Sequence, residues 1–169
     1  MTFMKQFKFC LPAGILILLL SGSLDAQSAL YIRLNDVVGN HTSLNNLKGT
    51  NLTVVDFWAT WCKPCVKSIP ELIKLSEQYK PKGVEFIGVN EDSPRNTSKV
   101  RPFVNSMGIS YPVLLDSEQK IMKTYLISVL PTLIIVDSSG EILYTHEGYT
   151  SGDEKIIQTK IDELLANRK

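Results

Sequence analysis

The chain has 169 residues, of which 44% are hydrophobic and 21% are charged, and its formal net charge is +1. This length fits one domain preceded by a short leader. The composition excludes an intrinsically disordered chain, and the near-zero net charge gives no basic field for nucleic acid. We therefore expect no nucleic-acid partner.

The first residues predict export. Lys5 and Lys8 precede an apolar run over residues 9–20, and small residues follow it. A positive segment, a short apolar segment and small residues form the pattern of a secretory signal peptide. The apolar run is shorter than the ~20 residues of a membrane-spanning helix. This favours a cleaved leader, with an uncleaved membrane anchor as the alternative.

Cleavage after Ser23 or Ala26 fits the small-residue pattern. We expect residues 1–26 to be the signal peptide or anchor and residues 27–169 to be one domain without an internal linker. Cys10 lies inside the leader and is interpreted as chemically inert. The protein is then exported to the periplasm or cell envelope.

Strand and helix patterns alternate along the domain, which predicts an α/β fold. The expected strands are residues 29–34, 52–58, 84–90, 111–116, 132–137 and 141–148. The expected helices are residues 62–79, 98–107, 118–126 and 153–166, with a short loop or helix over 42–49. Residues 52–58 are almost continuously apolar, as in a central strand covered on both faces.

Without the leader, the chain has only two cysteines, Cys62 and Cys65. A disulfide between residues three apart closes almost no loop, so it adds little entropic stability. The pair is therefore expected to serve chemistry. The alternatives are a purely structural bridge and half of a zinc site, although zinc needs further ligands.

Cys62 lies where an expected strand passes into a helix, so its sulfur meets the unpaired N–H groups of the helix start. Lys63 and Lys67 add positive charge, and Pro64 loses no hydrogen bond at this position. These features predict a Cys62 pKa below its usual value. Cys62 is then the attacking thiol, and Cys65, one turn later, resolves the mixed disulfide.

The segment "VVDFWATWCKPC", with Pro70 five residues after the second cysteine and "LPT" at residues 130–132, resembles the thioredoxin superfamily. The front extension and the leader resemble its exported TlpA/ResA branch, over roughly residues 29–167. This resemblance implies a thioredoxin-like fold: a central mixed sheet flanked by helices, with an N-terminal strand extension and an insertion after the first βαβ unit.

The resemblance also implies residue roles. Cys62 is the nucleophile and Cys65 the resolving thiol, and together they form the redox disulfide. Pro131 is a cis-proline facing the pair, with an ordinary strand-start proline as the alternative. Leu130 offers its backbone to an extended substrate. Trp61 covers the pair, with core packing as the alternative.

Two acids are candidate proton-handling groups. Asp56 interrupts the apolar strand, and the resemblance places it beneath Cys65, whose proton it handles with a raised pKa. The alternative is a solvated or hydrogen-bonded aspartate. The resemblance also implies an acid in the loop after the next strand, where Glu91 is favoured over Asp92. A solvated loop acid is the alternative there.

The dipeptide Lys63–Pro64 differs from the Gly–Pro of common thioredoxins, so the redox potential cannot be carried over from the family. The resemblance favours a monomeric reductase without cofactor or metal. It reduces disulfide-containing client proteins, for example in cytochrome c maturation, and receives electrons from a membrane thiol–disulfide donor. The alternatives are a disulfide-forming oxidase or isomerase, a thiol peroxidase, and a metal chaperone that adds His41 or His146 to the cysteines.

Overall fold

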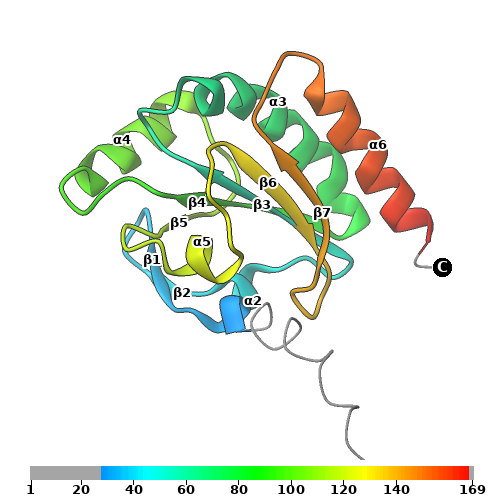
Figure 1. Ribbon diagram of the computed structural model, residues 1–169, viewed down its shortest axis with the longest axis horizontal. Coiled ribbons are helices and arrows are strands. Elements are labelled where there is room, and N and C mark those ends of the chain that lie inside the picture. Colours follow the sequence, from blue (N-terminus) through cyan, green and yellow to red (C-terminus); the bar gives the residue numbers. More distant parts are fainter. Residues whose placement is uncertain (1–27, 168–169) are drawn as a thin grey trace, which may run out of the picture.

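A computed structural model describes residues 28–167 of the chain (Figure 1). The strands are β1 (Leu34–Asp36), β2 (His41–Thr42), β3 (Leu52–Trp58), β4 (Val84–Asn90), β5 (Val113–Leu115), β6 (Thr132–Val136) and β7 (Ile142–Glu147). The helices are α2 (Leu44–Leu47), α3 (Lys63–Tyr79), the 3₁₀ turn η1 (Lys80–Lys82), α4 (Thr97–Met107), α5 (Lys120–Thr124) and α6 (Asp153–Ala166). The expected leader, residues 1–26, lies outside the described residues.

The strands form one mixed sheet in the order β2-β1-β5-β4-β3-β6-β7. β3 pairs in parallel with β4 and antiparallel with β6, and each of its residues is buried. The expectation of a central strand covered on both faces is therefore confirmed. The β6–β7 hairpin and the closing helix α6 also agree with the sequence pattern.

The side chains of β3 alternate between two hydrophobic clusters, as the period of a strand requires. Val54 and Trp58 pack on the face covered by α3, α4 and α6, whereas Val55 and Phe57 pack on the face covered by α2 and α5. Figure 1 shows these two groups of helices on opposite sides of the sheet. Asp56 has the parity of Val54 and Trp58, so its carboxyl group points toward α3.

The start of the domain differs from the sequence prediction. The expected strand over residues 29–34 is wrong for most of its length: residues 28–31 are helical, and β1 begins only at Leu34. Ala29 and Leu30 are fully buried beside α2 and α5, so packing determines their conformation. β1 instead pairs with the two-residue strand β2 and with β5, which gives the predicted N-terminal strand extension.

The β5–α5 corner is also shorter than predicted. The expected strand over residues 111–116 contracts to β5, and the expected helix over 118–126 contracts to α5. Gln119 has a left-handed backbone with φ of 58°, and Asp116 accepts hydrogen bonds from the first N–H groups of α5. The helix therefore begins only after residue 119.

Within residues 28–167, no helix combines the length and apolarity needed to cross a lipid bilayer.

Candidate active site

Cys62 and Cys65 form a disulfide at the start of α3, with an S–S distance of 1.98 Å and a Cα–Cα distance of 5.3 Å. Cys62 is the N-cap residue, and its N–H donates to the Ala59 carbonyl at 3.1 Å. The backbone N–H of Cys65 in turn donates to the Cys62 sulfur at 3.3 Å. The helix start therefore directs at this sulfur a backbone N–H that has no partner within the helix. This arrangement favours a thiolate there.

The surroundings of the two sulfurs are asymmetric. Cys65 is completely buried, whereas Cys62 retains 5% exposure. Trp61 is 64% exposed beside them, and Lys63 and Pro64 are exposed as well. Trp61 is therefore not a core residue. The residues around Cys62 form an accessible rim, while Cys65 lies behind it.

The peptide bond between Leu130 and Pro131 is cis, as predicted. The register pairs Phe57 of β3 with Thr132 of β6, so Pro131 lies at the sheet end from which β3 leads to Cys62. The Pro131 carbonyl accepts the N–H of Gly148 at 2.8 Å. This bond ties the segment after β7 to the cis-proline.

Asp56 is a buried acid of β3, on the sheet face covered by α3. It is 3% exposed, and within the described residues its Oδ2 has no hydrogen-bond partner. Burial raises its pKa from 3.8 to about 7. It borders a small cavity of about 10 Å³, whose lining residues are Asp56, Ser68, Leu72, Pro131, Leu133, His146, Gly148, Tyr149 and Ile157.

Aromatic groups lie near Asp56 on its β4 side. Asp56 pairs in register with Gly88, where a Cβ atom would lie 2.9 Å from Nε1 of Trp58. Only glycine allows this close approach of the indole. Tyr111 is buried nearby, and burial and the charge of Asp56 raise its pKa well above the usual value. A buried aspartate with such neighbours favours its neutral form.

A comparison with protein families identifies the chain. The family model described as AhpC/TSA matches residues 26–145, which is more than half of the sequence. The chain belongs to the AhpC/TSA family.

Relatives of this AhpC/TSA-family chain include two proteins named thiol-disulfide oxidoreductase ResA. The one from Bacillus thuringiensis (strain Al Hakam) is 40% identical over 108 residues, covering 64% of this chain and 61% of the relative. The one from Halalkalibacterium halodurans is 36% identical over 122 residues, covering 72% of this chain and 68% of that relative. The chain thus spans about three fifths of the length of the first relative.

The fold is similar to that of a thioredoxin-like protein from Porphyromonas gingivalis, with a TM-score of 0.67 and 32% identity. The similarity covers 80% of this chain and 90% of that protein. The predicted thioredoxin-like fold and the predicted resemblance to ResA are confirmed.

The two acids that follow β4 in this AhpC/TSA-family chain point to different places. Asp92 accepts the N–H of Thr60 at 2.8 Å and its hydroxyl at 2.7 Å, and it also accepts from Asn90 at 2.9 Å. It therefore holds the loop that precedes Cys62. Asp92, the alternative to Glu91 in the sequence prediction, is thus the acid in contact with the active-site loop.

The carboxyl group of Glu91 faces the β5–α5 corner. Glu91 is 5% exposed, and within the described residues neither of its side-chain oxygens has a hydrogen-bond partner. Burial, together with the negative charge of Asp116, raises its pKa to about 9. The catalytic role predicted for Glu91 stays a prediction. With a pKa of about 9, the Glu91 carboxyl group is neutral at pH 7.

The structure adds residues that the sequence analysis did not assign to this site. Ser68 of α3 donates to the Cys65 carbonyl at 2.9 Å and lines the Asp56 cavity. Its position three residues after Cys65 puts it on the same helix face, a signal present in the sequence. His146 and Tyr149 line the cavity because of strand pairing, which no local pattern reveals. Within residues 28–167, no three His, Cys, Asp or Glu side chains form a metal-binding group.

Proposed function

We propose that this chain is a thiol-disulfide oxidoreductase that reduces selected disulfides in client proteins. The observation that carries the proposal is the Cys62–Cys65 disulfide at the start of α3, at the same sheet end as cis-Pro131. The name of the ResA relatives, thiol-disulfide oxidoreductase, supports the same activity.

The reaction is a two-step exchange starting from the reduced pair. The Cys62 thiolate attacks one sulfur of a client disulfide, so the client S–S bond breaks and one client thiolate leaves. Cys65, after losing its proton, attacks the Cys62 sulfur of the mixed disulfide and releases the second client thiolate. Two electrons pass to the client, and the Cys62–Cys65 disulfide forms.

Asp56 is proposed to take the proton of Cys65. Supporting observations are its burial, its unpaired Oδ2 and its location on the sheet face covered by α3. A carboxyl group whose pKa is about 7 exchanges protons readily at neutral pH. Ser68, which bonds the Cys65 carbonyl, lines the cavity that Asp56 borders.

The exposed rim is proposed to contact the client. Trp61, Lys63 and Pro64 are exposed around Cys62, so an incoming chain meets them first. The Leu130 backbone before cis-Pro131 is proposed to pair with an extended client segment. Glu91, in the segment that follows β4, remains a candidate for a proton-handling role.

The proposed setting is outside the cytoplasm, with the N-terminal segment as signal peptide or anchor. A CxxC protein in an oxidising compartment needs a source of electrons to act as a reductant. We propose a membrane thiol–disulfide donor as this source. Apocytochromes c, which carry paired cysteines, are the proposed client class.

The test combines an insulin-reduction assay with a redox titration of the full chain. Cys62→Ser is expected to abolish turnover, because Cys65, the other cysteine of residues 28–167, is fully buried. Cys65→Ser is expected to accumulate a mixed disulfide with the client. A midpoint potential near ~−270 mV supports a reductant, whereas one near ~−120 mV assigns the chain to disulfide formation. Turnover by the Cys62→Ser variant would contradict the proposal.

The proton role of Asp56 is tested separately. Asp56→Asn is expected to slow release of the second client thiol by about a hundredfold or more near neutral pH, the scale of a lost general base. The first step, formation of the mixed disulfide, is expected to stay unchanged. An unaltered pH–rate profile of the second step would remove Asp56 from the mechanism.

A thiol peroxidase is a rival from another enzyme class, and it requires a threonine and an arginine near the reactive sulfur. Thr60 is the nearby threonine in sequence, but its hydroxyl donates to Asp92 at 2.7 Å. We therefore expect no steady-state peroxide consumption at a rate comparable to disulfide exchange. An assay with hydrogen peroxide and a dithiol reductant measures this difference.

A further inference from the structure

His146 of β7 lies on the wall of the cavity that Asp56 borders. Asp56 pairs with Leu133, and Leu133 pairs with His146, so the three residues form one row across β3, β6 and β7. Directly paired residues on antiparallel strands project to the same face. Asp56 and His146 therefore approach one cavity from the two sides of Leu133.

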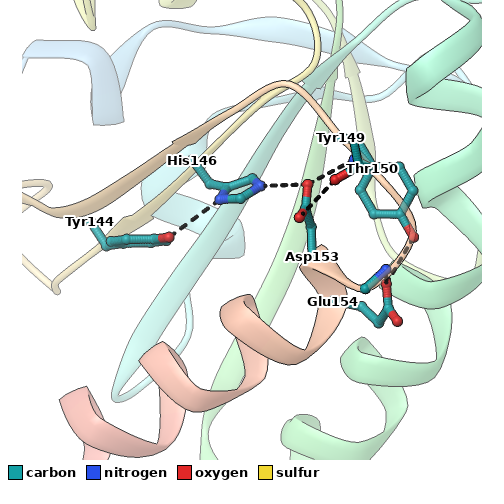
Figure 2. Close-up of polar contacts among 7 residues, drawn as sticks. Tyr144, His146, Tyr149, Thr150, Asp153 and Glu154 are labelled. Atoms are coloured by element: carbon teal, nitrogen blue, oxygen red, sulfur yellow. Dashed lines mark hydrogen bonds and ion pairs between the residues drawn. The ribbon is translucent and has the colours of Figure 1, made fainter.

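The imidazole of His146 is held by two contacts, shown in Figure 2. Its Nε2 lies 3.1 Å from Oδ2 of Asp153 at the start of α6, and its Nδ1 lies 3.3 Å from the Tyr144 hydroxyl. Thr150 donates its N–H and hydroxyl to Asp153 as well. These bonds lower the pKa of Asp153, so its carboxylate is charged.

A charged Asp153 fixes the tautomer of the ring. The carboxylate accepts an N–H from Nε2, so the proton of the neutral imidazole resides there and Nδ1 is the basic nitrogen. The Nδ1 contact with Tyr144 is the longer of the two, and a hydroxyl exchanges partners readily. Lys160 lies over the Tyr144 ring, 5.5 Å from its centroid, and adds positive charge on that side.

Few groups around the cavity can carry a proton at neutral pH. Tyr149 keeps its proton, because burial and its bond to Glu154 raise its pKa to about 12. Tyr111, on the other side of Asp56, also has a raised pKa. Ser68 offers a hydroxyl but no titratable group. Histidine is the residue type that exchanges a proton near neutrality, and the His146 side chain is 15% exposed, so it reaches solvent.

We propose that His146, held by Asp153, is the proton exit of Asp56. The inference rests on the proposed function, in which Asp56 receives the proton of Cys65. The cavity of about 10 Å³ is close to the volume that one water needs, and Asp56 Oδ2 supplies it with an unpaired acceptor. His146 acts through Asp56, so it is a positioning residue rather than a catalytic one.

The proton transfer balances as follows. The water accepts the proton of the Asp56 carboxyl and passes one of its own to Nδ1 of His146, whose contact with Tyr144, a residue outside the cavity lining, must first break. The resulting imidazolium is stabilised by the Asp153 carboxylate and releases its proton to solvent. Asp56 is then a carboxylate again and ready for the next turnover.

The experiment measures the second exchange step, release of the second client thiol, over repeated turnovers of the full chain with excess dithiol reductant, because Asp56 needs the exit only after its first turnover. In weak buffer, His146→Gln is expected to slow this step by about tenfold, with a shifted pH profile. Added imidazole is expected to restore the rate to within about twofold, which a structural defect would not allow. His41→Gln is the matched control, since His41 is exposed on β2, and its rate stays that of the wild type.

A double variant separates the two proposals. If Asp56 and His146 act in one path, His146→Gln in the Asp56→Asn background causes no further loss. Additive losses, or a normal rate for His146→Gln beside a slow Asp56→Asn, would overturn the exit alone. A normal rate for Asp56→Asn would instead remove the Asp56 role and the exit with it. Should His146→Gln unfold, Asp153→Asn is expected to slow the step severalfold with the same rescue by imidazole.

Discussion

Asp56 and Asp116 are both buried aspartates, but their oxygens have different partners. Asp116 is fully buried at the β5–α5 corner and accepts three backbone N–H groups at 2.7, 2.7 and 3.1 Å, from Lys120, Ile121 and Met122. Asp56 lies in β3, and within the described residues its Oδ2 accepts none. Burial raises the pKa of both, and only at Asp116 do backbone hydrogen bonds counteract the rise.

This difference separates a structural acid from a reactive one. The N–H groups that bind Asp116 are the free donors of a helix start, so the acid determines where α5 begins. The charge of Asp56 has no such compensation, so the group gains and loses a proton near neutral pH. A buried acid is thus a candidate proton carrier when its oxygens lack partners, and a local scaffold when they have them.

Between pH 4 and 7 the largest expected effect comes from Asp56→Asn. The folded-state pKa of Asp56 is about 7, above its value of 3.8, so the wild type loses stability as pH rises through this range. The loss in the free energy of unfolding reaches about 4 kcal/mol above pH 7. Asp56→Asn removes it, so the variant gains stability relative to wild type between pH 4 and 8. Urea unfolding at several pH values measures this gain. If the free energies of unfolding of the variant and the wild type differ by the same amount at every pH, the raised pKa of Asp56 is contradicted.

Glu91→Gln extends the comparison to the acid beside Asp116. The Glu91 pKa of about 9 is also raised, so its contribution to stability continues to fall until pH 9. Between pH 7 and 9 the wild type is expected to lose about 3 kcal/mol more than Glu91→Gln does. The Asp56→Asn variant serves as control, because it tracks the wild type in this range. Equal pH dependence for wild type and Glu91→Gln would show that Glu91 is not buried in solution.

Asp116→Ala has the smallest expected effect on stability. Three backbone N–H groups of α5 lose their acceptor, which lowers the free energy of unfolding by about 2 kcal/mol. Loss of the negative charge also lets the Glu91 pKa fall. The disulfide-exchange rate of the folded protein is expected to equal that of wild type. A rate that falls as far as in Asp56→Asn would remove the distinction between the two acids.

Much of the site could be predicted because its signals are local. Residues 52–79 show the pattern of an apolar strand followed by the pattern of a helix, and this places Cys62 at the helix start. The resemblance to thioredoxins added cis-Pro131, which the structure contains. Asp56 is a candidate on sequence alone because it is the one charged residue in an otherwise apolar strand pattern.

Other features could not be predicted, because they depend on contacts between distant segments. The Glu91 carboxyl turns toward Asp116, while Asp92 bonds Thr60. The sequence does not show which of these two adjacent acids makes which contact. Residues 28–31 form a helical turn rather than a strand because the core holds Ala29 and Leu30 there.

The sequence by itself determined the α/β class, the order of most elements and the redox pair, since periodicity and the helix-start position of Cys62 are properties of adjacent residues. Tertiary structure alone decided that His146 shares a cavity with Asp56, 90 positions earlier in the chain. The physical reason is that the row Asp56–Leu133–His146 exists only after β3, β6 and β7 pair in register.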